Sequence, residues 1–78
     1  MAYTTYIVIN GADVEFMRVK DSIIEDYIDE RVDDDGENFE EVMEALFSEW
    51  CQNEFAWNGC QSVWEVTNVS PLEYQKVF

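Results

Sequence analysis

The sequence predicts an α+β domain in which two helices pack on one face of a small antiparallel sheet. Three observations carry this prediction: a strand–turn–strand pattern at the N-terminus, two helical stripes in the middle, and a further alternating segment near the C-terminus. The 78 residues allow a single domain, 1–78, and a 47% apolar content predicts a folded core rather than disorder. The expected order is therefore ββααβ(β).

The N-terminal segment predicts a β-hairpin. Residues 3–9 alternate in the manner of a strand, and Asn10-Gly11 is a pair typical of a two-residue hairpin turn. With this pair at the centre of the turn, the apolar face pairs Ile9 with Ala12, Ile7 with Val14 and Thr5 with Phe16. Tyr6 and Val8 then lie on a mixed, partly solvated face. A longer loop from Asn10 to Asp13 is the alternative register.

A first helix is expected to begin at Asp21. Its apolar stripe is Ile23, Ile24, Tyr27, Ile28 and Val32. Ser22 and Glu25 have capping-box spacing, and Asp21 could cap instead. Residues 33–37, with the sequence Asp-Asp-Asp-Gly-Glu, are expected to end this helix.

A second helix is expected from Asn38, which has Glu41 three residues later, to about Phe55. Its stripe consists of Phe39, Val42, Met43, Leu46, Phe47 and Trp50. Residues 62–69 then read as a third strand with Trp64 and Val66 on one face, and residues 74–78 as a short fourth strand after Ser70-Pro71. Trp50 and Trp64 are both expected in the core.

The negative charge is concentrated in one window. Residues 21–54 hold fourteen Asp or Glu and one base, Arg31, and so carry −13 of the formal net charge of −14. A confined anionic surface repels nucleic acid and anionic membranes, and it attracts cations or proteins with a positive working surface. The N-terminus carries no signal or spanning segment, so we expect a cytoplasmic protein. Cys51 and Cys60 read as core thiols, with a disulfide across the intervening turn as the alternative.

On a helical wheel, six acids lie opposite the first apolar stripe: Asp21, Glu25, Asp26, Asp29, Glu30 and Asp33. They are spread over roughly 18 Å of helix axis, about one carboxylate per 3 Å, which is close to the phosphate spacing of a DNA strand. Like-charge pairs four residues apart should together cost on the order of 1 to 2 kcal/mol of stability. Because the arrangement costs stability, it indicates that the acids bind a partner and are not merely a solvated surface.

Other kinds of site fit the sequence less well. Aligning Gly36 with the glycine of an EF-hand loop places Arg31 and Val42 at ligand positions, so only weak Ca²⁺ or Mg²⁺ binding by the loop is expected. The chain has no His and no nucleophile or phosphate-loop motif, which argues against an enzyme and against a cofactor.

In overall character, the acidic window of this small folded domain resembles the DNA-mimic inhibitors of bacteriophages and mobile elements. These include anti-CRISPR proteins, anti-restriction proteins and uracil-DNA glycosylase inhibitors. The resemblance implies a non-enzymatic inhibitor, acting in the host cytoplasm, that blocks the basic DNA-binding surface of a host protein. A Cas protein or Cascade complex is favoured, because such sites are short and basic. The alternative of a different class is a non-mimetic antitoxin or adaptor.

The partner-binding residues expected on this basis are Asp21, Glu25, Asp26, Asp29, Glu30, Asp33, Asp34, Asp35, Glu37, Glu40, Glu41 and Glu44. No direct contact with nucleic acid or with a membrane is expected. Within the inhibitor class, an anti-restriction protein or an inhibitor of a DNA-repair enzyme is the next alternative after an anti-CRISPR protein.

Overall fold

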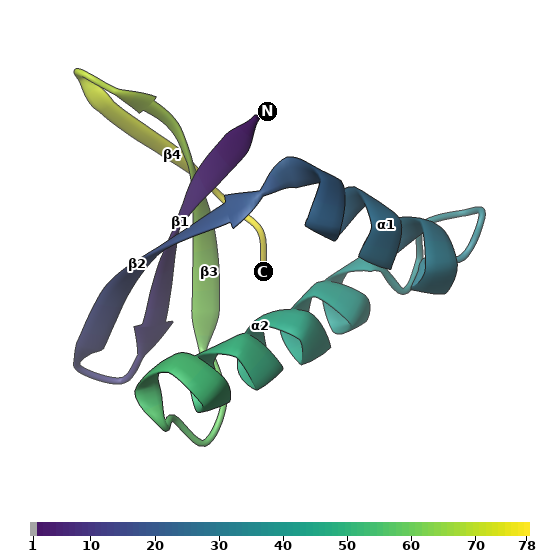
Figure 1. Ribbon diagram of the computed structural model, residues 1–78, viewed down its shortest axis with the longest axis horizontal. Helices are drawn as coiled ribbons and strands as arrows, with labels where there is room; N and C mark the ends of the chain where they lie inside the picture. The colour runs from purple at the N-terminus through teal and green to yellow at the C-terminus, as the bar shows by residue number, and fades with distance from the viewer. Residues whose placement is uncertain (1) are drawn as a thin grey trace.

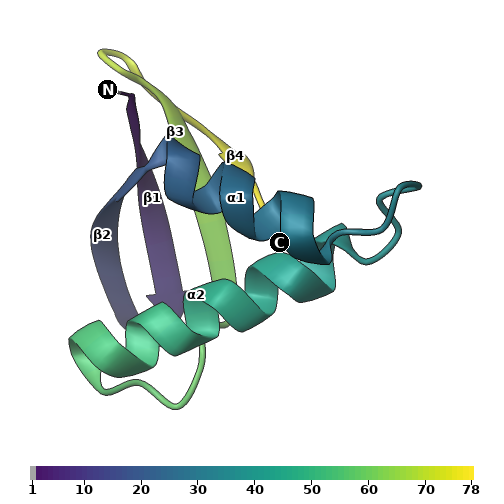
Figure 2. The same ribbon diagram turned by 45° about the vertical axis from the view of Figure 1, so that its right-hand side comes forward.

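The computed structural model describes residues 2–78 and has the predicted α+β architecture (Figure 1). The elements in chain order are β1 (Tyr3–Asn10), β2 (Asp13–Lys20), α1 (Asp21–Arg31), α2 (Phe39–Phe55), β3 (Ser62–Val69) and β4 (Leu72–Lys76). The four strands form one antiparallel sheet in the order β2-β1-β3-β4. Both helices lie on the same side of this sheet (Figure 2). The predicted order is confirmed, with the optional fourth strand present.

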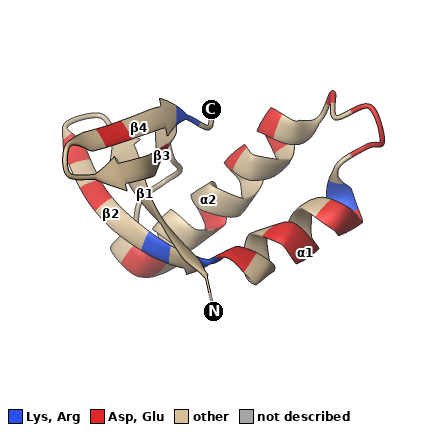
Figure 3. Cartoon of the chain, turned by 90° about the horizontal axis from the view of Figure 1, so that it is seen from above, with Lys and Arg blue, Asp and Glu red and all other residues tan. Residues whose placement is uncertain are grey.

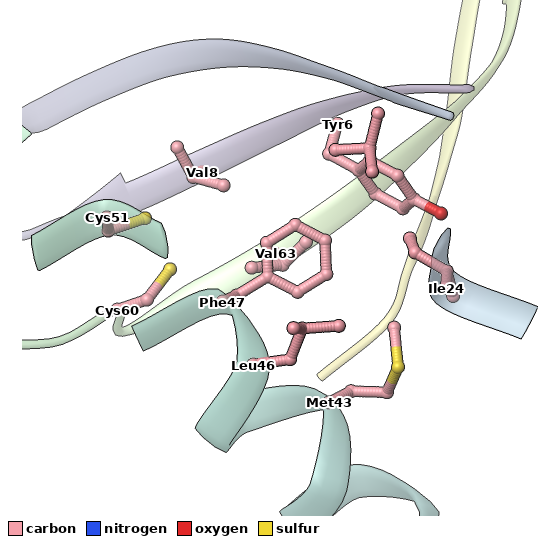
Figure 4. Close-up of a cluster of buried hydrophobic side chains, with 10 residues drawn as sticks. Tyr6, Val8, Ile24, Met43, Leu46, Phe47, Cys51, Cys60 and Val63 are labelled. Atoms are coloured by element: carbon pink, nitrogen blue, oxygen red, sulfur yellow. The ribbon is translucent and has the colours of Figure 1, made fainter. Parts of the chain in front are cut away.

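The core lies between the sheet and α2, around the fully buried ring of Phe47 (Figure 4). Tyr6 and Trp50 meet this ring edge-on, with centroids 4.9 Å and 5.2 Å away. Val8 of β1 and Val63 of β3 are fully buried beside it, and α1 contributes Ile24. The two predicted helical stripes therefore supply the core, except that Ile23 of α1 and Phe39 of α2 are exposed.

The hairpin register differs from the first expectation. Asn10 pairs with Asp13, so the turn centre is Gly11-Ala12, within the loop named as the alternative. Gly11 has φ of +63°, and glycine at the first central position is typical of a type II′ turn. Moving the turn by one residue shifts every pairing by two residues, so the residues that share a face stay together.

The expectation for the two faces of this hairpin was wrong. The face with Tyr6 and Val8 is the buried one, and the face with Val14 and Phe16 points away from the helices and is exposed. In the observed register, Tyr6 pairs with Met17 and Thr4 with Val19, so the inner face is more apolar than the expected pairing of Tyr6 with Glu15. Apolar residues thus occur on both faces of the hairpin, and the helices decide which face is buried.

Both helices begin where expected, but without the expected caps. The N-cap residues are Lys20 for α1 and Asn38 for α2, and within residues 2–78 neither helix start has a side-chain cap hydrogen bond. The capping-box prediction was therefore wrong. The Asn38 side chain instead holds the connecting loop, because it accepts a hydrogen bond from the Asp33 amide and donates one to the Arg31 carbonyl.

In β3, Trp64 and Val66 share one face, as expected. The last strand, β4, begins two residues earlier than predicted. Trp64 was wrongly expected in the core: it lies on the sheet face away from the helices, where its ring meets Tyr74 edge-on at 5.6 Å. A bulge between Val66 and Asn68 interrupts the β3–β4 pairing. This edge of the sheet is therefore shorter and less regular than the β2 edge.

Candidate acidic interface

The exposed side of α1 carries the first part of the candidate interface. Glu25, Asp26, Asp29 and Glu30 are all exposed, and acidic residues, coloured red, recur along α1 in Figure 3. Together with Asp21 they place five carboxylates along nine residue steps, or roughly 14 Å of helix axis. This keeps the charge spacing close to that of a DNA strand, about 3.4 Å per phosphate. We call Glu25, Asp26, Asp29 and Glu30 the acidic face of α1.

Asp21 differs from the other acids of this helix. Its carboxylate is only partly exposed, and it accepts a hydrogen bond of 2.6 Å from the Thr4 hydroxyl. The Asp21 amide also donates to the Ala2 carbonyl at 3.0 Å. Asp21 therefore ties the start of α1 to β1, a structural role that the sequence pattern did not indicate.

The loop between the helices carries the second group of acids. Because α1 ends at Arg31, Asp33 belongs to this loop. The expectation that Asp33 lies on the first helix was wrong. Asp33, Asp34, Asp35 and Glu37 are all exposed. The loop turns at Gly36, whose φ is +73°, and the Asp35 carboxylate accepts a hydrogen bond from the Glu37 amide at 3.1 Å.

The loop's shape is set by short-range hydrogen bonds. The Gly36 amide donates to the Asp33 carbonyl at 2.8 Å, and the Asp33 amide donates to the Asn38 side chain at 2.7 Å. These bonds fix the backbone of the loop beside the end of α1. The loop carboxylates therefore extend the acidic face of α1 from a defined backbone.

The start of α2 supplies the last predicted residues. Glu40 and Glu41 occupy the first turn of α2, and Glu44 follows one turn later. All three are exposed. Acids in the first turn interact favourably with the helix dipole, so Glu40 and Glu41 cost less stability here than they would in the middle of a helix.

Basic residues compensate little of this charge. Arg31 forms a 3.0 Å ion pair with Glu30 and also stacks over the Tyr27 ring, 3.9 Å from its centroid. Within residues 2–78 this is the single ion pair between side chains. The other bases, Arg18, Lys20 and Lys76, lie on the strands (Figure 3). The structure thus places the twelve predicted residues on one continuous stretch, α1, the loop and the start of α2, with all but Asp21 exposed.

The acids of this stretch do not converge on a common point. Within the described part of the chain, no group of three or more His, Cys, Asp or Glu side chains is placed to hold a metal ion. The carboxylates are spread along the surface, an arrangement suited to contact with an extended positive surface.

The two cysteines lie in the core. Both thiols are free and buried, which agrees with the core-thiol interpretation. Burial raises the pKa of Cys51 to about 12 and also raises the pKa of Cys60. A thiol that stays protonated is a poor nucleophile.

Comparison of the chain with models of protein families, with curated proteins and with solved structures found no match. Neither of the helices within residues 2–78 is long and apolar enough to cross a membrane.

Proposed function

We propose that this protein is a non-enzymatic inhibitor that imitates the charge of nucleic acid and blocks the DNA-binding surface of a host defence protein. The favoured target is a Cas protein or Cascade complex, which makes the protein an anti-CRISPR protein. The observation that carries the proposal is the row of exposed carboxylates on α1, the loop and the start of α2, with Arg31 as the one base among them.

Two features of this row support an interface over a merely solvated surface. Glu25 and Asp29, and Asp26 and Glu30, are like-charge pairs four residues apart on one helix, and such pairs destabilise a helix by roughly 0.2–0.5 kcal/mol each. The carboxylates also repeat at a spacing close to that of DNA phosphates. A basic groove that binds a DNA strand would therefore find matching charges on this helix.

A competition assay tests the proposal. A fluorescently labelled target duplex is bound to each member of a panel: Cas nucleases, Cascade complexes, restriction enzymes and uracil-DNA glycosylase. The protein should displace the duplex from at least one of them, and the displacement should weaken as salt concentration rises. If the duplex is displaced only from a restriction enzyme or only from the glycosylase, the protein is an inhibitor of that enzyme and not an anti-CRISPR protein. Displacement from none of them would contradict the proposed function.

Two triple variants locate the surface. Asp26→Lys, Asp29→Lys and Glu30→Lys reverse three of the four acids of the acidic face of α1. Asp13→Lys, Glu15→Lys and Glu73→Lys make the same change of net charge at exposed positions on the strands. The first variant should lose displacement at least about tenfold, the equivalent of one strong charge pair, and the second should retain most of it. Equal losses would show that net charge, and not this surface, is responsible.

A further inference from the structure

The sheet has one long, regular free edge, and a groove runs beside this edge. β2 is an edge strand of eight residues that pairs with β1 without a bulge. The opposite edge, β4, has five residues and faces the bulge in β3. Bulges and short strands are common ways of protecting a sheet edge against added strands, and β2 has neither.

The register shows which backbone groups of β2 are free. Because a two-residue turn closes on Asn10 and Asp13, the odd-numbered residues of β2 exchange hydrogen bonds with β1. The even-numbered residues Val14, Phe16 and Arg18 direct their N–H and C=O groups to the other side. In the sheet of residues 2–78 no strand lies on that side.

A groove of about 660 Å³ runs along this edge. Residues 16–20 of β2 all line it, although their side chains alternate between the two faces of the sheet. Only a groove at the edge of the strand can contact the side chains on both faces of the sheet. The other side of the groove is formed by Ile23 of α1 and by Trp50, Glu54 and Phe55 of α2. Its volume is within the range of about 300–1,000 Å³ that is usual for binding sites.

We propose that this groove binds an extended segment of a partner protein, which adds to the sheet as a fifth strand beside β2. The backbone of the segment would pair with Phe16 and Arg18. Its alternate side chains would be apolar on the helix side, where Trp50, Phe55 and Ile23 form the wall. The side chains between them would face outward, beside Phe16 and Arg18, where the structure favours acids.

Charge favours an acidic segment over a second copy of this chain. Arg18 and Lys20 are two of only four bases in the protein, and both line the groove, whereas Glu54 is its single acid. Arg18 is held over the Tyr3 ring, 4.5 Å from its centroid, on the outer face of the sheet. A second copy would bring another net charge of −14 against the first, which opposes pairing of β2 with β2.

Selection from a phage-displayed library of random nonapeptides tests the proposal, with counter-selection against Phe16→Pro. The proline removes an outward N–H and leaves the hydrogen bonds to β1 in place, so an edge strand tolerates it. Enriched peptides should alternate apolar residues with Asp or Glu. In hydrogen exchange, a synthetic copy of an enriched peptide should slow exchange at the Val14, Phe16 and Arg18 amides.

Phe16→Ala serves as the matched control, because it also removes the phenyl ring but keeps the amide. The synthetic peptide should bind Phe16→Pro at least about tenfold more weakly than Phe16→Ala, given a comparable melting temperature for the two variants. Arg18→Glu should likewise weaken binding, while the triple reversal of Asp26, Asp29 and Glu30 should not weaken it. This last variant separates the groove from the proposed inhibitory surface.

Three results would overturn the proposal. One is a selection that enriches no alternating peptides. Another is equal affinity of the peptide for Phe16→Pro and Phe16→Ala. The third is a dimer of the free protein, detected by light scattering and lost in Phe16→Pro, which would assign the groove to a second copy of the chain.

Discussion

At the scale of single residues, Asp21 has a structural role that the exposed acids of α1 do not have. Its carboxylate accepts the Thr4 hydroxyl in a partly buried contact, whereas Glu25 is exposed. Asp21→Ala should therefore lower the free energy of unfolding by about 1 kcal/mol, the usual value of such a hydrogen bond. Glu25→Ala should leave it unchanged or raise it slightly, since it removes like-charge repulsion. Urea denaturation measures both, and equal effects would contradict the assignment.

Ala56 offers a stabilising substitution. It ends α2 with φ of 58° and ψ of 31°, the left-handed conformation that costs a residue with a Cβ roughly 1–2 kcal/mol. Ala56→Gly removes this cost but gives the unfolded chain more freedom, so a net gain of about 0.5–1 kcal/mol is expected. Ala45→Gly, at an exposed position inside α2, should instead lower stability by about 1 kcal/mol. A lower melting temperature for Ala56→Gly would rule out this conformation.

Three buried groups predict how stability responds to alkaline pH. Burial, as the largest cause, raises the pKa of Cys51 to about 12 from 9.0 and that of Tyr6 to about 12 from 10.0, and it also raises the pKa of Cys60. Above about pH 9, the unfolded chain therefore loses protons that the folded protein keeps, and stability falls as pH rises toward about 12. Urea midpoints should be lower at pH 10.5 than at pH 8. A smaller fall is expected in the double variant Cys51→Ala, Cys60→Ala, and no fall in the wild-type protein would contradict the burial of these groups.

At the scale of elements, the acids on the surface of α1 destabilise this helix. Its acids repel one another at four-residue spacing, and Arg31 pairs only with Glu30. The reversal of Asp26, Asp29 and Glu30 to Lys turns the repulsion between positions 25 and 29 into an attraction but leaves like charges at positions 26 and 30, so it should raise the free energy of unfolding by about 0.5 kcal/mol in low salt while it weakens inhibition. Thermal melts at low and high salt measure this, because the gain should shrink as salt screens the charges. A destabilised variant would mean that these acids serve the fold.

The helices were more predictable from sequence than the hairpin. Apolar residues such as Met43, Leu46 and Phe47 recur at the spacing of a helix, so both helix starts and the end of α2 were predicted correctly. The hairpin has apolar residues on both faces, Tyr6 and Val8 on one and Ile7 and Phe16 on the other. Its local pattern therefore could not show which face the helices would cover.

The capping prediction failed for a related reason. Ser22 and Glu25 have the spacing of a capping box, but α1 already begins at Asp21, so Ser22 lies inside the helix. The Asp21 carboxylate, the other candidate cap, instead accepts a hydrogen bond from Thr4 in a distant part of the chain. Asn38 is likewise used by the Asp33 amide and the Arg31 carbonyl. Contacts of this kind appear only once the elements are placed in space.

At the scale of the whole molecule, charge is divided between two layers. The helices and their loop carry fourteen of the eighteen acids, and three of the four bases lie on strands of the sheet, Arg18 and Lys20 on β2 and Lys76 on β4. The acidic stretch was predictable, because consecutive residues along one helix and loop stay together in space. The groove beside β2 was not predictable, because it depends on the strand order and on the approach of α2 to the sheet edge.

The central claim is that the acidic face of α1 takes the place of nucleic acid, and partner capture tests it most directly. The immobilised protein is incubated with a lysate of a bacterium that carries CRISPR and restriction systems, and bound proteins are eluted with excess duplex DNA. The claim predicts that a nucleic-acid-binding protein is captured, that DNA releases it, and that the triple Lys variant of Asp26, Asp29 and Glu30 does not capture it. A captured partner that stays bound in saturating DNA would contradict the claim.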